Sequence, residues 1–175
     1  MNTIVIYKSK YGSTKSYAEW IAQELSCKAV DASKVKADDL ADYDTIIYGG
    51  GLYAEVIAGV SIITKNLNKL SGKKLIVFTT GLTPPECREY YDDLVVKKNF
   101  KGDALSHIKM YNYPGKMIIS ELSLVHKTAI KTLKKIMSDK KNPTEMEKLL
   151  IDLCDVDADL TDKELIKELV EYAKN

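Results

Sequence analysis

The segment IVIYKSKYGSTKSYAEWIAQEL, residues 4–25, changes character twice along its length. Its first part is continuously apolar, which predicts a buried strand over residues 3–7 rather than a strand exposed on alternate positions. A short polar loop with a single glycine follows. From Thr14 to Leu25, apolar residues recur at three- and four-residue spacing, which is typical of an amphipathic helix. A strand, a tight loop and a helix in this order form the first part of a βαβ unit.

The same alternation continues along the chain. Further strands are predicted at residues 27–32, 44–51, 73–81 and 104–111. Further helices are predicted at residues 56–70, 86–96 and 117–137, and two capping boxes, Thr144 with Glu147 and Thr161 with Glu164, predict two more. Strands that alternate with helices indicate parallel strands joined by crossovers. We therefore predict an α/β fold, a doubly wound, five-stranded parallel sheet with helices on both faces.

Size and composition indicate an ordinary globular chain. It has 175 residues, of which 45% are apolar and 29% are charged, and its net charge is +1. We expect a single domain over residues 1–175. The near-neutral charge argues against a nucleic-acid partner. Without a long apolar run or a leader-like N-terminus, the expected location is the cytoplasm. The three cysteines are widely spaced and form no CxxC pair, so no metal site is predicted.

The polar loop after the first strand has the composition of an anion site. Ser9, Ser13 and Thr14 carry hydroxyl groups around Gly12. The predicted helix starts at about Thr14, so its free N–H groups and the positive end of its dipole favour a phosphate. The alternative is that these residues are ordinary helix N-caps. One such residue is enough for a cap, so three of them favour phosphate binding.

Two known phosphate motifs are absent from this loop. The letters GSTKS at residues 12–16 lack the G-x-x-x-x-G-K-[ST] spacing of a Walker loop, which disfavours hydrolysis of a nucleoside triphosphate. No G-x-G-x-x-G follows the first strand, which disfavours a dinucleotide. A single phosphate in a compact, hydroxyl-lined loop therefore points to a mononucleotide.

Two more predicted strands end in glycine-bearing segments. Residues 49–54, GGGLYA, contain glycines that let a backbone approach a flat ligand, followed by an apolar and an aromatic side chain. Residues 79–85, TTGLTPP, contain another glycine, and their prolines stiffen the chain. In an open parallel sheet, ligands bind outside the carboxyl ends of the strands. The three segments together predict a slot for a planar, phosphorylated ring system.

These motifs resemble those of the flavodoxin-like FMN proteins over essentially the whole chain. The resemblance rests on SKYGST at residues 9–14 and on YDTIIYGGGLY at residues 43–53. It implies the strand order 2-1-3-4-5 and FMN as the cofactor. The segment YNYPGKM at residues 111–117, with the long basic helix after it, is similar to a subgroup that includes the menaquinone-dependent protoporphyrinogen oxidase.

The resemblance implies an FMN site made of three segments. The phosphate would be held by Ser9, Lys10, Tyr11, Gly12, Ser13 and Thr14. The loop near the flavin N5 edge would be formed by Gly50, Gly51, Leu52 and Tyr53. The other side of the ring would be contacted by Thr80, Gly81 and Leu82.

The function that the resemblance implies is electron transfer or a small flavin-dependent oxidoreductase reaction. The flavin would do the chemistry and the protein would tune it, so no residue is assigned a catalytic role. The expected partner is a redox protein or a small electron donor or acceptor. The alternatives are protoporphyrinogen oxidation coupled to a quinone and an FMN-free binding module.

The helix predicted at residues 117–137 carries a basic side. Lys127, Lys131, Lys134 and Lys135 share this side, which would suit a contact with anionic lipid. A solvated helix face is the favoured interpretation, because exposed lysines usually serve that purpose. No feature of the sequence indicates an oligomeric state.

Overall fold

The main sheet has the strand order that the sequence predicts. The computed structural model describes residues 2–102 and 104–175. In these residues, five parallel strands are arranged in the order β2-β1-β3-β5-β6. They are β1 (Thr3–Lys8), β2 (Lys28–Asp31), β3 (Thr45–Tyr53), β5 (Lys74–Gly81) and β6 (Ile108–Pro114). The predicted order 2-1-3-4-5 is confirmed, because β5 and β6 are the fourth and fifth strands of the prediction.

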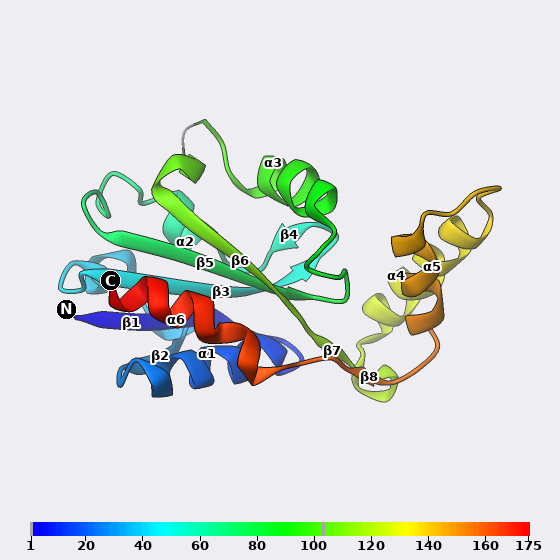
Figure 1. Cartoon of the computed structure of the whole chain (residues 1–175), viewed down its shortest axis with the longest axis horizontal. Helices are drawn as coiled ribbons and strands as arrows, with labels where there is room; N and C mark the ends of the chain where they lie inside the picture. Colours follow the sequence, from blue (N-terminus) through cyan, green and yellow to red (C-terminus); the bar gives the residue numbers. More distant parts are fainter. Residues whose placement is uncertain (1, 103) are drawn as a thin grey trace.

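Helices cover both faces of this sheet, as predicted (Figure 1). The helices α1 (Ser13–Glu24) and α6 (Lys167–Lys174) pack on one face. The other face is covered by α2 (Ser61–Thr64), the π-helical segment η3 (Tyr90–Val95) and α3 (Val96–Asn99). The chain is therefore a doubly wound α/β fold.

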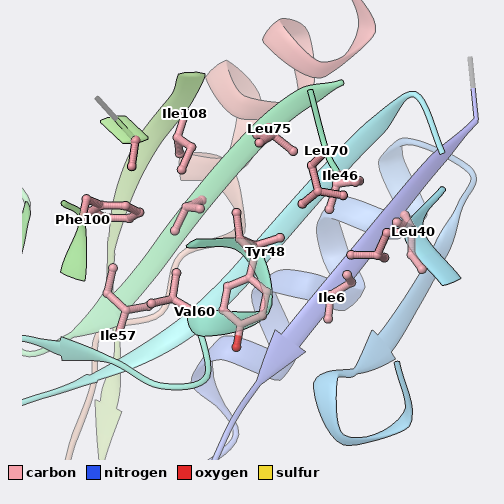
Figure 2. Packing of buried hydrophobic residues seen from close by; sticks show 14 of the residues in the cluster. Ile6, Leu40, Ile46, Tyr48, Ile57, Val60, Leu70, Leu75, Phe100 and Ile108 are labelled. Atoms are coloured by element: carbon pink, nitrogen blue, oxygen red, sulfur yellow. The ribbon is translucent and has the colours of Figure 1, made fainter. Parts of the chain in front are cut away.

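The central strands are buried on both faces, which explains why their sequences are continuously apolar. Ile47 of β3 and Ile76 of β5 are neighbours in the register and lie on the side of α1 and α6. Ile46 and Tyr48 point to the opposite side, where Figure 2 shows them in one cluster with Val60. Burying an aliphatic side chain of this size contributes about 1.5–3 kcal/mol of hydrophobic stabilisation.

β3 continues into a tight hairpin that the sequence analysis did not predict. Its last residues pair antiparallel with β4 (Val56–Ile57), and the turn residues Ala54 and Glu55 have φ values of 48° and 61°. Positive φ at both turn residues is what a type I′ hairpin turn requires. The prediction of one helix over residues 56–70 is therefore wrong. After the hairpin, Gly59 adopts a φ of 73°, and the helix α2 is only 4 residues long.

Two other predicted elements are shifted. The helix predicted at residues 86–96 is replaced by η3 and α3, which start later and continue beyond it. The strand predicted at residues 104–111 begins with a 3₁₀ turn, η4 (Ala104–His107), so that β6 starts only at Ile108. Boundaries of this kind depend on hydrogen bonds to neighbouring elements, which the local sequence does not contain.

A helical hairpin stands apart from the sheet, beyond the carboxyl ends of its strands (Figure 1). The helices α4 (Leu124–Ser138) and α5 (Glu145–Leu153) pack against each other. They are inserted between β7 (Lys116–Met117) and β8 (Ala158–Asp159), which pair antiparallel. No helix among residues 2–102 and 104–175 combines the length and the apolar character of a membrane span.

The helix predicted at residues 117–137 starts later than predicted, at Leu124. Met117 belongs to β7, and Ser123 is the N-cap of α4. The apolar residues of α4 are only partly buried, since Val125 is 75% exposed. The helix packs against α5, which covers only part of its apolar surface.

One of the two predicted capping boxes is confirmed. Thr144 and Glu147 exchange hydrogen bonds at the start of α5. At the second position, the N–H and the hydroxyl of Thr161 both donate to the carboxylate of Asp159. The following 3₁₀ turn, η6 (Lys163–Ile166), is therefore capped by Asp162 instead.

The close contact between Gly49 and a core aromatic ring generates a test of the fold. A Cβ atom added at Gly49 would lie 2.1 Å from Cζ of Phe78. We expect Gly49→Ala to lower the free energy of unfolding by about 1–3 kcal/mol, because a close-packed core has no space for the methyl group. In the double variant with Phe78→Leu, the loss should be smaller than the sum of the two single losses. Denaturant unfolding of the four proteins measures this coupling, and additive losses would contradict it.

Candidate functional site

The three predicted segments lie at one edge of the sheet. The strands β1, β3 and β5 are parallel neighbours, so the residues that follow them gather at their carboxyl ends. The direction of strand order reverses between β1 and β3, which is where open α/β sheets bind ligands. In Figure 1, this edge faces the α4–α5 hairpin.

The loop between β1 and α1 is shaped by Ser9 and Gly12. Oγ of Ser9 accepts a hydrogen bond from the N–H of Gly12 at 3.1 Å. Gly12 has a φ of 95°, which favours glycine, and it occupies the N-cap position of α1 without a capping side chain. Ser13 and Thr14 lie inside the helix. The alternative that these hydroxyl residues are N-caps is therefore wrong, and α1 begins with an uncapped N-terminus.

The first turn of α1 contains backbone donors without a partner. The first hydrogen bond of the helix runs from the N–H of Ser16 to the carbonyl of Gly12 at 3.0 Å. Within the part of the chain that the structure describes, the N–H groups of Ser13, Thr14 and Lys15 have no protein acceptor. The turn also contains no acidic residue. Free N–H groups at the positive end of a helix dipole bind an anion such as phosphate.

The hydroxyl groups of the loop keep protons that they can donate. Oγ of Ser9 and Oγ of Ser13 each accept a backbone N–H, the latter from Lys116 at 2.9 Å, so neither hydroxyl proton is used in these bonds. Thr14 and Thr80 share one hydrogen bond of 2.7 Å between their buried hydroxyls. Only one of their two protons lies between the oxygens. The first and third predicted segments are thus in direct contact.

The predicted glycine loop is part of the sheet. Gly50 and Gly51 lie within β3, paired with Thr79 and Thr80 of β5. The space above Gly50 is filled, because an added Cβ would lie 2.5 Å from Cγ2 of Ile57. The prediction that these glycines form a loop is therefore wrong, since the hairpin turn comes only at residues 54 and 55.

The second glycine of this pair, Gly51, is covered by the side chain of Tyr53, two residues further along the chain. A Cβ atom added at Gly51 would lie 3.1 Å from the ring of Tyr53. Next to it, Leu52 lies beside Gly81, because a Cβ atom at Gly81 would be 3.5 Å from the Leu52 side chain. Leu82, directly after β5, is half-buried. A planar ligand at this edge would therefore meet the side chains of Leu52, Tyr53 and Leu82 rather than bare glycine backbone.

A polar and aromatic cluster connects the loop to α4. The hydroxyl of Tyr11 lies 2.7 Å from Nδ1 of His126 and accepts the N–H of Ser123 at 3.3 Å. The ring of Tyr53 lies 5.0 Å from the His126 ring, and Nζ of Lys10 donates to Oγ of Ser123 at 3.4 Å. The sequence analysis did not assign Ser123 or His126 to the site. No local signal reveals them, because they are more than a hundred residues from the loop.

The environment of this cluster changes the acidity of its members. Burial, and to a smaller extent the ammonium group of Lys10, lower the pKa of His126. Burial, with the nearby Tyr11, raises the pKa of Tyr53. At neutral pH both groups are therefore uncharged, and a neutral His126 can accept the hydroxyl proton of Tyr11 at Nδ1. The folded chain disfavours protonation of His126. The free energy of unfolding should therefore decrease as the pH falls below the ordinary histidine pKa of about 6.5, where the unfolded chain takes up the proton more readily.

Substitution of Lys10 can separate the effect of its charge on the pKa of His126 from the effect of burial. We expect Lys10→Met to raise the pKa of His126, because one of the two causes of the lowered value is removed. An NMR titration of the His126 ring protons measures this. Lys28→Met, at the amino end of β2, removes a charge at the opposite end of the sheet and should leave the value unchanged. An identical His126 titration in Lys10→Met and in the parent protein would contradict the assignment.

Comparison with known proteins identifies the family. The flavodoxin domain family model matches residues 4–144. An uncharacterized protein of Methanocaldococcus jannaschii is 31% identical over 105 residues, which cover 58% of this chain and 69% of that protein.

Solved flavodoxin structures are also similar to the chain, at low identity. A flavodoxin from the domain Archaea is 15% identical, with 88% of this chain and 96% of that chain covered and a TM-score of 0.41. The two-electron-reduced flavodoxin of Megasphaera elsdenii is 15% identical, with 87% and 97% covered and a TM-score of 0.45. Scores this low carry no argument of their own, and the assignment rests on the family model. Because that model spans most of the sequence, the chain belongs to the flavodoxin domain family.

Proposed function

We propose that this protein binds FMN and acts in electron transfer, either as a carrier or as a small flavin-dependent oxidoreductase. The observation that carries the proposal is the uncapped N-terminus of α1 at the switch point of the sheet. Membership of the flavodoxin domain family supports it, because the loop in question lies within the matched residues. The proposed partner is a redox protein or a small electron donor or acceptor, and the proposed location is the cytoplasm.

The donors of the loop fit the phosphate group of FMN. The N–H groups of Ser13, Thr14 and Lys15 are free and would bind phosphate oxygens. The hydroxyls of Ser9 and Ser13 would add two O–H donors, since each accepts but does not give a proton in the protein. No carboxylate of the first turn competes with the anion. Lys10 and Tyr11, also assigned to the phosphate loop, instead contact Ser123 of α4.

The side chains beyond the loop would enclose the ring system. The ring would be bordered by Leu52, Tyr53, Gly81 and Leu82. The buried hydrogen bond between Thr14 and Thr80 joins the loop before α1 to the end of β5. When bound, the flavin supplies one- and two-electron transfer. The contribution of the apolar and aromatic side chains is to exclude water from the ring and to hold it in one orientation.

The finer assignment to a protoporphyrinogen oxidase stays a prediction. None of the relatives named above is described as such an enzyme. A membrane contact of α4, the less favoured interpretation of its basic side, would use lysines that already have partners within the protein. Lys134 forms an ion pair with Asp155, and Nζ of Lys127 donates to the carbonyl of Ser120 at 3.3 Å.

The left-handed backbone of Gly12 provides a test of the phosphate loop. In Gly12→Ala, the free loop can relieve the strain by leaving this conformation, and FMN must then restore it. We expect FMN affinity to fall roughly 10- to 100-fold, the equivalent of about 1–3 kcal/mol of backbone strain. Gly72→Ala is the matched control, because Gly72 has a φ of 78° and no atom within 4 Å of an added Cβ, at a distant turn. Equal FMN affinity in Gly12→Ala and in Gly72→Ala would contradict the role of the loop.

Visible spectroscopy of the purified protein tests the proposed cofactor directly. We expect the protein to bind one equivalent of FMN with a flavin absorption spectrum and changed FMN fluorescence. A protein that binds no flavin after incubation with excess FMN would support the FMN-free binding module instead. Direct reduction by a pyridine nucleotide would favour an oxidoreductase. Reduction only through a ferredoxin or another redox protein would favour a carrier.

A further inference from the structure

A lysine to which the sequence analysis gave no role lies against the phosphate loop. Lys116 is the first residue of β7, and its backbone N–H donates to Oγ of Ser13 at 2.9 Å. A Cβ atom built on Gly12 would lie 3.4 Å from Cε and 3.5 Å from Nζ of Lys116. Both the backbone and the side chain of Lys116 are therefore next to the N-terminus of α1.

The ammonium group of Lys116 forms no ion pair within the part of the chain that the structure describes. Among residues 2–102 and 104–175, no carboxylate oxygen lies within 4.0 Å of its Nζ. Asp159 is opposite Lys116 in the β7–β8 register, but the hydrogen bonds of its carboxylate come from Thr161. These bonds are the main cause of the lowered pKa of Asp159, and the charge of Lys116 is the smallest one. A positive group beside the positive end of a helix dipole is unfavourable unless an anion joins them. The placement of this lysine is thus an independent indication of an anionic ligand.

The fold holds Lys116 in place from two sides. The N–H of the preceding Gly115 donates to the carbonyl of Gly81 at 2.7 Å, and the carbonyl of Gly115 accepts the N–H of Leu160 at 3.1 Å. These bonds tie the start of β7 to the end of β5 and to the segment after β8. The ammonium group is therefore carried by a fixed backbone rather than by a free loop.

We propose that Lys116 is the counter-ion of the ligand's phosphate group, and that it makes the site select a phosphorylated flavin over the same ring without phosphate. This inference rests on the proposed function. Lys10, which the resemblance places in the phosphate loop, differs from Lys116 because its Nζ is directed to Oγ of Ser123. Lys116 has no such partner within the described chain, so its charge is available to the phosphate.

The test compares FMN with riboflavin, which has the same ring and no phosphate. We expect Lys116→Met to weaken FMN binding roughly 10- to 100-fold, as for the loss of a charged hydrogen bond. Riboflavin affinity should stay within about twofold, because the lost group does not contact the ring. Lys116→Arg should keep most of the preference for FMN. Lys28→Met, which removes the same charge at the far end of the sheet, should resemble the parent protein. Fluorescence titration gives the four dissociation constants for each ligand.

Two further measurements separate this role from a structural one. The thermal midpoint of the ligand-free Lys116→Met variant should equal or exceed that of the parent protein, because an unfavourable charge contact is removed. The salt dependence of FMN affinity should become weaker in this variant, because the phosphate has lost a counter-ion. Unchanged FMN affinity, an equal loss of FMN and riboflavin affinity, or a lower ligand-free midpoint would each overturn the inference. A parent protein that binds neither flavin would overturn the proposed function, and the inference with it.

Discussion

The first turn of α1 leaves three backbone N–H groups without acceptors among residues 2–102 and 104–175, and most features of the candidate site follow from them. Such groups must be satisfied by water, by a side chain or by a ligand. The side chain that would ordinarily cap them is missing, because Gly12 occupies the N-cap position at a φ of 95°. No acidic residue of the turn replaces it. The donors and the dipole of this turn therefore favour a negatively charged group beside it.

The surroundings of this turn come from distant parts of the sequence. Thr80 at the end of β5 shares a buried hydrogen bond with Thr14, and Lys116 at the start of β7 donates its N–H to Ser13. The start of α4 lies against Tyr11 through Ser123 and His126. The parallel strands β1 and β5 end at the same edge of the sheet, and the pairing of β7 with β8 and the packing of α4 bring Lys116 and His126 to that edge. The loop is thus completed by groups from distant segments that hold its shape and, through Lys116, add positive charge.

The glycines of β3 make space for side chains of the protein core rather than for a ligand. They were predicted to let the backbone approach a flat ligand, but Gly49 makes space for Phe78 and Gly50 makes space for Ile57. Glycine in a central strand often marks the close approach of another group, and here that group belongs to the protein. The residues that would meet a planar ligand are Leu52 and Tyr53, the side chains that follow the glycines. The glycines thus serve the packing of the core, and the predicted site residues Leu52 and Tyr53 border this edge of the sheet.

The alternation of strands and helices, the buried central strands and the position of the hydroxyl-rich loop before α1 could all be predicted from the sequence, because each depends on local periodicity or on a few adjacent residues. The hairpin at Ala54 and Glu55, the late start of α4 and the cap at Asp162 could not. These depend on hydrogen bonds between segments that are far apart in the chain. The same holds for the site: the uncapped turn is local, whereas the positions of Lys116 and His126 follow from the pairing of β7 with β8 and the packing of α4. Local sequence determines which backbone groups are left without partners, and only the packing of distant segments determines which charges and rings surround them.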